Sequence, residues 1–220
     1  MKHVLLATCL AGVATLAGIA SAQTADDSAP VGKQAGTFMI RGRVIGVIPE
    51  DNSSSTSIGG HVEATAQAAP ELDFSYFFTD NIAAELIAAS TRHELSAVGT
   101  GLGKVDVGST WVLPPALTLQ YHFMPHEKFS PYVGVGIDAM FFYSTNPSTP
   151  VVQKLTLNDN VGAVLQAGFD YNFSGHWFAN VDVKQIFLNT DAHLQTVLGP
   201  VSARTSLDPL VVGVGVGYRF

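Results

Sequence analysis

The stretch that decides the fold is Leu210-Val-Val-Gly-Val-Gly-Val-Gly-Tyr-Arg-Phe220, at the C-terminus. Side chains alternate between the two faces of a β-strand. One face of this stretch is therefore wholly apolar and ends in Tyr218 and Phe220, whereas the other carries glycines and ends in Arg219. An apolar face of this kind fits the lipid-facing side of a membrane barrel, but it also fits a core strand of a soluble β-sandwich. The rest of the chain has to separate these two interpretations.

The N-terminus has the pattern of a secretory signal peptide. Lys2 precedes an apolar stretch from Val4 to Ile19, and Ala20-Ser21-Ala22 follows as a small-residue cleavage site. Because the apolar stretch is shorter than the roughly 20 residues that a membrane-spanning helix needs, we expect cleavage after Ala22 rather than a membrane anchor. The single cysteine, Cys9, lies inside this segment. We therefore expect neither disulfides nor cysteine chemistry in the mature chain.

Composition narrows the class of protein. The formal net charge of −7 argues against nucleic acid as a partner, and the length suits one domain. Glycines and polar residues interrupt every apolar run after the signal peptide. If the mature chain lies in a membrane, it must therefore span it as strands.

Alternating apolar and polar residues predict eight strands separated by long and short connections in turn. The expected strands cover residues 38–47, 71–78, 82–89, 116–123, 131–143, 161–173, 177–188 and 210–220. The long connections, 49–70, 90–115, 144–160 and 189–208, have the composition of loops. Consecutive hairpins predict an all-β, up-and-down antiparallel barrel, and several of the strands have the length that a tilted membrane-spanning strand needs. We expect short periplasmic turns, long extracellular loops, a signal peptide over 1–22, a flexible lead-in over 23–37 and the barrel over 38–220.

The positions of aromatic and charged residues favour a membrane barrel over a soluble one. Aromatics gather on the apolar face beside the short turns and the C-terminus, as in an interfacial girdle: Phe78, Phe123, Tyr171, Phe173, Trp177, Tyr218 and Phe220. Phe141 and Phe187 mark a thinner band at the opposite strand ends. The other face is rich in glycine and carries nine charges, which would line the lumen: Arg41, Arg43, Asp73, Glu85, Asp138, Asp170, Asp182, Lys184 and Arg219.

Several segments, in order along the chain, resemble one known family. They are Phe77-Phe78-Thr79-Asp80-Asn81-Ile82-Ala83-Ala84-Glu85-Leu86, Leu113-Pro114-Pro115-Ala116-Leu117, Lys128-Phe129-Ser130-Pro131-Tyr132-Val133-Gly134-Val135-Gly136, Gln166-Ala167-Gly168-Phe169-Asp170-Tyr171, Asp208-Pro209 and Gly217-Tyr218-Arg219-Phe220. This combination is similar to the outer membrane protein W (OmpW) family.

The resemblance implies an eight-stranded outer-membrane barrel of a Gram-negative bacterium with a narrow, partly apolar lumen. It further implies passage of small hydrophobic molecules, with lateral release through the wall into the bilayer as one route. The chain departs from the family pattern at Val161, where many members carry an aromatic residue after an Asp-Ser pair, so the constriction is expected to be built differently. Gly215, Tyr218 and Phe220 resemble the C-terminal signal that the barrel-assembly machinery reads.

The candidate functional residues all lie on the expected lumen face. The nine charges either pair for stability, since an unpaired buried charge is costly, or bind a ligand. Phe77, Ile87 and Met140 are apolar at inward positions; they either form a constriction or are ordinary packing in a small barrel.

Other kinds of site find little support. Gly134 and Gly136 are not followed by the helix that a dinucleotide fingerprint needs. His61, His93 and His193 fall in three long connections without metal-ligand spacing. No nucleophile motif accompanies the serines or His122. We therefore expect no enzyme activity, no cofactor and no metal.

Two functional hypotheses remain. The first is a narrow channel or carrier for passive uptake or efflux of small hydrophobic molecules. The second is a structural or receptor barrel with a closed lumen, whose loops bind partners or lipopolysaccharide. In either case the expected surroundings are outer-membrane lipid and the assembly machinery.

Overall fold

A computed structural model describes residues 32–49, 55–56, 61–100, 103–148, 152–196, 199–206 and 208–220. The expected signal peptide and residues 23–31 of the lead-in lie outside these ranges. Within the described residues, no helix is long and apolar enough to cross a bilayer.

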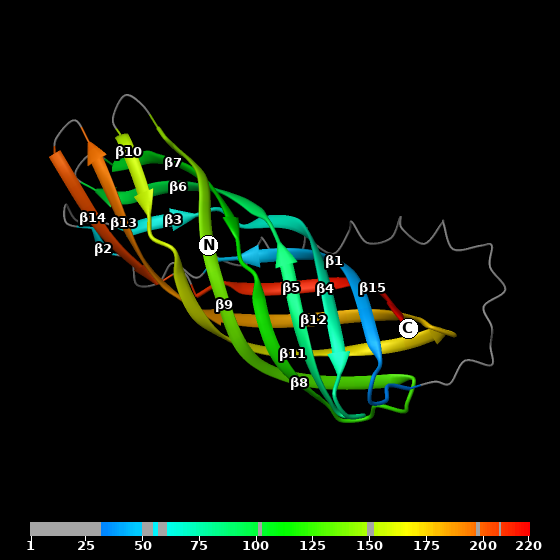
Figure 1. The fold of residues 1–220 in the computed structure, drawn as a ribbon. Coiled ribbons are helices and arrows are strands. Elements are labelled where there is room, and N and C mark those ends of the chain that lie inside the picture. The colour runs from blue at the N-terminus through cyan, green and yellow to red at the C-terminus, as the bar shows by residue number, and fades with distance from the viewer. Residues whose placement is uncertain are drawn as a thin grey trace.

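Eight antiparallel strands close into a barrel, which confirms the predicted fold (Figure 1). Around the ring they are β11 (Asn160–Ser174), β12 (Trp177–Phe187), β15 (Leu210–Arg219), β1 (Phe38–Ile48), β4 (Gln67–Phe77), β5 (Ile82–Ala89), β8 (Ala116–His122) and β9 (Phe129–Pro147). Pairing of β9 with β11 completes the circle. Apart from the pair that closes the ring between the chain ends, sequential barrel strands lie side by side, as in an up-and-down barrel.

The first and last barrel strands form the seam of the barrel. β1 pairs with β15 from Met39 opposite Arg219 to Ile48 opposite Leu210. The glycine-rich face of β15 turns inward, where large side chains from its neighbours approach. A Cβ atom on Gly217 would overlap the ring of Phe178. Glycine is required here because the Phe178 ring occupies the space that a side chain would need.

The outer surface of the ring is apolar and aromatic. At the short-turn end, the aromatics of the expected girdle are at least partly exposed, and Phe78, Phe123 and Phe220 more than half so. Phe141 and Phe187 are exposed nearer the opposite ends of their strands. Between these two levels lie exposed aliphatic side chains such as Val135 and Ile137. A continuous apolar belt of this kind is stable against lipid and would be an aggregation site in water.

The long connections are present, but they contain more strand than their composition suggests. They include β2 (Ser55–Thr56), β3 (His61–Ala64), β6 (Thr91–Thr100), β7 (Gly103–Leu113), β10 (Val152–Leu157), β13 (Asn189–Thr196) and β14 (Gly199–Ser206). β3, β6 and β7 extend the sheet along the upper part of β9, while β10, β13, β14 and β2 form a second sheet. In Figure 1 these strands continue beyond the end of the barrel that is opposite the short turns.

A small apolar cluster joins these two outer sheets. It consists of Ala97, Val107, Val152, Leu155 and Val201, which come from strands of both sheets. Outside the lipid, a strand can carry polar residues on either face, and the strict alternation that reveals a membrane-spanning strand is lost. Residues such as Asn189-Thr190-Asp191 in β13 show this mixed pattern.

Candidate functional site

The interior of the barrel is divided into three layers along its axis. At the short-turn end, Met39, Phe77, Ala83 and Phe178 form a small apolar cluster. A layer of buried charges follows, and beyond it lies a larger apolar region that includes Ile87 and Met140. Phe77, Ile87 and Met140, for which a constriction and ordinary packing were the two alternatives, are therefore not brought together. Phe77 packs against the His122 ring, with 4.9 Å between ring centroids, on the far side of the charged layer from the other two.

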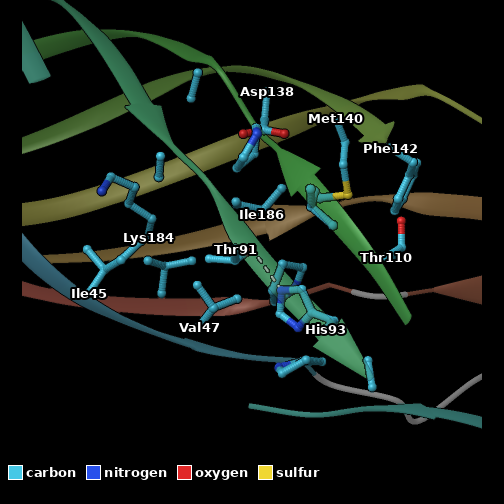
Figure 2. A pocket seen from close by; sticks show the side chains of 18 of the residues that line it. Ile45, Val47, Thr91, His93, Thr110, Asp138, Met140, Phe142, Lys184 and Ile186 are labelled. Atoms are coloured by element: carbon cyan, nitrogen blue, oxygen red, sulfur yellow. Dashed lines mark hydrogen bonds between the residues drawn. The ribbon is translucent and has the colours of Figure 1, made fainter. Parts of the chain in front are cut away.

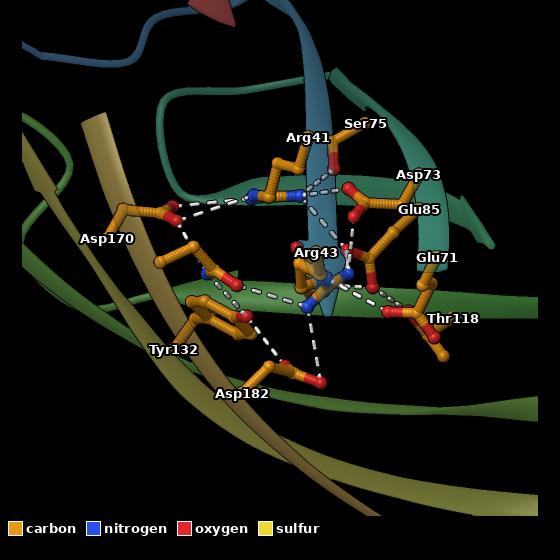
Figure 3. A network of polar contacts seen from close by, with 12 residues as sticks. Arg41, Arg43, Glu71, Asp73, Ser75, Glu85, Thr118, Tyr132, Asp170 and Asp182 are labelled. Carbon is orange, nitrogen blue, oxygen red and sulfur yellow. Dashed lines mark hydrogen bonds and ion pairs between the residues drawn. The ribbon is translucent and has the colours of Figure 1, made fainter. Parts of the chain in front are cut away.

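The charged layer, which we call the polar plug, contains four cations and five carboxylates joined by ion pairs: Lys33, Arg41, Arg43, Lys184, Glu71, Asp73, Glu85, Asp170 and Asp182. β1 supplies its centre (Figure 3). Arg41 Nη1 lies 2.8 Å from Asp73 Oδ1 and 2.9 Å from Glu85 Oε1. Its Nη2 lies 3.3 Å from Asp170 Oδ2. Arg43 Nη2 reaches the same two acids as Nη1 of Arg41, at 2.6 Å from Asp73 Oδ2 and 2.9 Å from Glu85 Oε1.

A second group of charges continues the plug toward β11 and β12. Lys184 Nζ lies 2.9 Å from Glu71 Oε1 and 3.0 Å from Asp182 Oδ1. Arg43 links this group to the first, since its Nε lies 3.0 Å from Glu71 Oε1. Tyr132 donates its hydroxyl hydrogen to Asp182 Oδ2 at 2.6 Å. Each carboxylate is thus held by at least one cation, as burial requires.

Lys33 enters the plug from the lead-in. Its Nζ lies 2.8 Å from Asp170 Oδ2, donates to Ser130 Oγ at 2.8 Å, and lies 2.9 Å from Nδ1 of His122. Burial lowers the pKa of Lys33 to about 8, because desolvation of the ammonium outweighs the attraction of Asp170. The side chain therefore remains mainly charged at pH 7 and counts as the fourth cation. Residues 32–37 accordingly make specific contacts with the barrel at its short-turn end.

Amide and hydroxyl groups fill the space between the charges. Gln166 Nε2 donates to Glu85 Oε2 at 2.7 Å and to Asp182 Oδ2 at 2.8 Å. Gln120 Nε2 donates to Glu85 Oε2 at 2.8 Å, and Asn180 Nδ2 donates to Asp170 Oδ1 at 2.8 Å. Residues that line an open, water-filled pore would be exposed, yet Glu85 and Asp182 are 0% exposed. The plug therefore closes the lumen at this level.

An apolar chamber lies on the other side of the plug, toward the outer sheets (Figure 2). About 1160 Å³ of space, including the part open to solvent, is not filled by atoms. Its walls include Ile45, Ile87, Ala89, Met140, Val164 and Ile186. The ionisable side chains at its boundary are Glu71, Asp138, Lys184 and His93. The lining is predominantly apolar, as in most small-molecule sites.

Seven of the nine charges expected in the lumen belong to the plug, and the other two lie elsewhere. Arg219 is at the short-turn end, where its Nη2 donates to the carbonyl of Gly175 at 3.4 Å. Asp138 lies in the wall of the chamber. Glu71 and Lys33 complete the plug but are missing from the sequence-based candidates. Alternation with Asp73 places Glu71 on the inward face, whereas nothing in the local pattern marks Lys33.

Two of the three histidines of the long connections, His93 and His193, have side chains that the structure describes. His93 Nδ1 lies 2.8 Å from the Thr65 carbonyl and its Nε2 lies 2.9 Å from Thr91 Oγ1. His193 is exposed, and the side chain of His61 lies outside the described residues. Among the residues that the structure describes, no group of three His, Cys, Asp or Glu side chains is placed to hold a metal ion.

Comparison with known proteins agrees with this architecture. The model of the OmpW family matches residues 34–220. The chain belongs to the OmpW family. Outer membrane protein W of Vibrio cholerae is 30% identical over 96% of this chain and 98% of its own length. An uncharacterized outer-membrane protein of Sinorhizobium fredii, y4mB, is 46% identical over 83% of this chain and 80% of its own length.

The fold of this OmpW-family barrel is also similar to that of a solved structure. The crystal structure of OprG from Pseudomonas aeruginosa superposes with a TM-score of 0.81 at 28% identity, covering 86% of this chain and 98% of OprG. The protein is thus an outer-membrane barrel of a Gram-negative bacterium. We expect its short turns to face the periplasm and its outer sheets to face the medium, as is usual for outer-membrane barrels.

Proposed function

We propose that this barrel carries small hydrophobic molecules from the medium into the outer membrane. The observation that carries the proposal is the apolar chamber, which lies on the extracellular side of the polar plug and is lined mainly by aliphatic side chains. Transfer of an apolar solute from water to such surroundings is favourable by about 25 cal/mol per Å² of buried surface. A relative from Pseudomonas aeruginosa, 26% identical over 74% of this chain, is named as a dibenzothiophene metabolism operon protein, and dibenzothiophene is an apolar aromatic compound.

The plug directs the solute sideways rather than along the axis. Below the chamber, a hydrophobic molecule meets a layer of buried, paired charges. It cannot solvate these charges, and separating them would cost much free energy. In the barrel wall beside the chamber, the pairing between strands is interrupted. β5 and β8 pair only up to Ile87 opposite Ala116, and pairing between β6 and β7 begins at Thr91 opposite Val112.

Prolines explain this interruption of the strand ladder. Residues 113–115 face 88–90 across the gap, and Pro114 and Pro115 have no N–H group to donate. Ala89, Pro114 and Ala116 all line the chamber. We place the lateral exit between these two short segments, because small side chains and missing hydrogen bonds make this the easiest part of the wall to open.

Uptake by cells tests the proposal. Ala89 points into the chamber, whereas Ala163 on β11 points outward. The variant Ala89→Trp should fill the chamber and reduce uptake of a hydrophobic solute toward that of cells lacking the protein. The variant Ala163→Trp carries the same bulk on the lipid face of β11, away from the proposed exit, and should leave uptake near the wild-type rate. Equal uptake by all four strains would contradict the proposal.

The closed plug also favours a second candidate, a receptor or structural barrel that binds its partners through the outer sheets. The same variants separate the two functions. A barrel that only presents an outer surface should be indifferent to Ala89→Trp, provided that the amount in the membrane is unchanged. A steady ion current through the wild-type barrel in a planar bilayer would contradict the closed plug on which this alternative depends.

A further inference from the structure

Asp138 is a buried carboxylate in the wall of the apolar chamber, and its Oδ1 accepts no hydrogen bond from the described residues. It lies on β9 and is 1% exposed. Within the described part of the chain, four buried side-chain atoms lack a hydrogen bond: Arg43 Nε, Asp73 Oδ2, Asp138 Oδ1 and Asp182 Oδ1. The other three atoms take part in ion pairs of the plug. Asp138 Oδ1 has neither kind of contact among the described residues.

Lys184, the cation of the chamber boundary, makes no hydrogen bond or ion pair with Asp138 among the described contacts. Lys184 Nζ is directed at two other carboxylates, at 2.9 and 3.2 Å from the oxygens of Glu71 and 3.0 Å from Asp182 Oδ1. An ammonium has three hydrogens to donate, so these contacts account for them. Figure 2 shows Asp138 and Lys184 as separate side chains of the chamber, projecting from β9 and β12.

The surroundings of Asp138 are otherwise apolar. Ala116 lies opposite it on β8, and Met140 follows on the same face of β9. A buried polar group without a partner is costly, and a hydrogen-bond donor that arrives through the chamber would remove that cost. We propose that Asp138 is a head-group subsite, which accepts a hydrogen bond from the hydroxyl or ammonium group of an amphipathic molecule whose hydrocarbon part fills the chamber. This inference rests on the proposed function and narrows its substrate class.

The charges of the chamber select against anions. Its described ionisable boundary contains the carboxylates Glu71 and Asp138, the ammonium of Lys184 and the hydrogen-bonded ring of His93. Because Lys184 is already held by Glu71 and Asp182, the carboxylate of a fatty acid finds no free hydrogen-bond donor beside Asp138 and is repelled whenever Asp138 is ionised. An alcohol or an amine of the same chain length finds an acceptor instead. Alkanols and alkylamines are therefore the favoured class, and fatty acids are the disfavoured one.

The methionines of this chain provide a direct measurement of binding. We suggest titrating the full-length protein in lipid nanodiscs, labelled with ¹³C at the methionine methyl groups, with decane, 1-decanol, decylamine and decanoate. Met140 lines the chamber and reports binding there. Met39 is fully buried beneath the plug, and the exposed Met124 at the short-turn end reports partition into the bilayer. The four ligands share one chain length, so differences among them come from the head group.

We expect 1-decanol and decylamine to shift the Met140 signal at concentrations about tenfold lower than decane or decanoate, as one hydrogen bond to a charged group implies. The variant Asp138→Leu should remove this preference while still binding decane. It should also fold, because it replaces an unpartnered carboxylate by an apolar group of similar size. Asp138→Asn keeps an acceptor and should retain decanol binding while losing much of the preference for decylamine.

Two different results would overturn these ideas separately. If all four ligands shift Met140 equally, or if Asp138→Leu keeps the preference for 1-decanol, Asp138 is not a head-group subsite, although the chamber still binds hydrocarbon. If none of the ligands shifts Met140 in the wild-type protein while Met124 reports their partition, the chamber is not a binding site. In that case the proposed function fails together with the subsite.

Discussion

Replacing Arg41 by methionine should destabilise the barrel strongly, because three carboxylates would lose one of their cations. Arg41 is 0% exposed and lies within 3.3 Å of oxygens of Asp73, Glu85 and Asp170. Without it the plug holds three cations for five carboxylates. Removing one partner of a buried ion pair typically costs about 3–5 kcal/mol. We expect Arg41→Met to lower the free energy of unfolding by about this amount.

Urea unfolding in lipid vesicles, followed by the fluorescence of Trp111 and Trp177, measures this loss. The matched control is Arg92→Met, because the Arg92 side chain is 47% exposed and pairs with Glu94, which is 67% exposed. An exposed pair of this kind is worth about 0–1 kcal/mol. The reasoning is refuted if Arg41→Met is no less stable than Arg92→Met.

Lowering the pH separates lost charge from lost packing in the same variant. The uncompensated carboxylates of Arg41→Met repel one another only while they are ionised. Protonating them relieves the repulsion in the variant, so the variant recovers stability as the pH falls. The difference in unfolding free energy between the two proteins should therefore shrink from pH 7 to pH 4. A difference that is the same at both pH values would assign the effect to packing.

Three further substitutions probe other parts of the fold. Lys33→Met should loosen residues 32–37 while leaving the barrel folded, because Asp170 keeps Arg41; faster amide exchange confined to these residues would be the sign. Gly168→Ala should lower the unfolding free energy by about 1–3 kcal/mol, since its Cβ would lie 2.6 Å from the Tyr132 hydroxyl, and urea titration checks this. Phe220→Ser should reduce the amount of barrel assembled in cells, measured on outer-membrane fractions, but scarcely change the stability of barrel refolded in vitro, because Phe220 is 64% exposed.

Period-two alternation was sufficient to predict the membrane-spanning strands, because lipid imposes one apolar face on each of them. It placed Arg41, Asp73 and Lys184 on the inward face, where the structure buries them. Their relative positions along the barrel axis depend on the register between neighbouring strands. The sequence of one strand alone does not determine this register. For this reason Phe77 and Ile87, both inward and apolar, were expected together but lie on opposite sides of the plug.

Other features of the structure could not be predicted because no pattern in the neighbouring sequence indicates them. Lys33 lies in a small, polar segment, and its role depends on contacts with Asp170 and Ser130, more than 90 positions along the chain. The outer strands, such as β6 and β7, continue beyond the end of the barrel (Figure 1), so lipid does not impose a strict alternation on their residues. The missing partner of Asp138 is a property of the assembled chamber and cannot be read from its sequence neighbours.

The seam between β1 and β15 couples the order of folding to the chemistry of the interior. Arg41 and Arg43 meet Glu71 and Asp73 as soon as β1 pairs with its hairpin partner β4. Their contacts with Asp170 and Asp182, on β11 and β12, form only when β15 docks beside β1. In an unclosed sheet, the two arginines of the edge strand β1 thus lack two of their carboxylates, which lie on β11 and β12 near the other edge. Closing the barrel and completing the ion pairs of its interior are therefore one event.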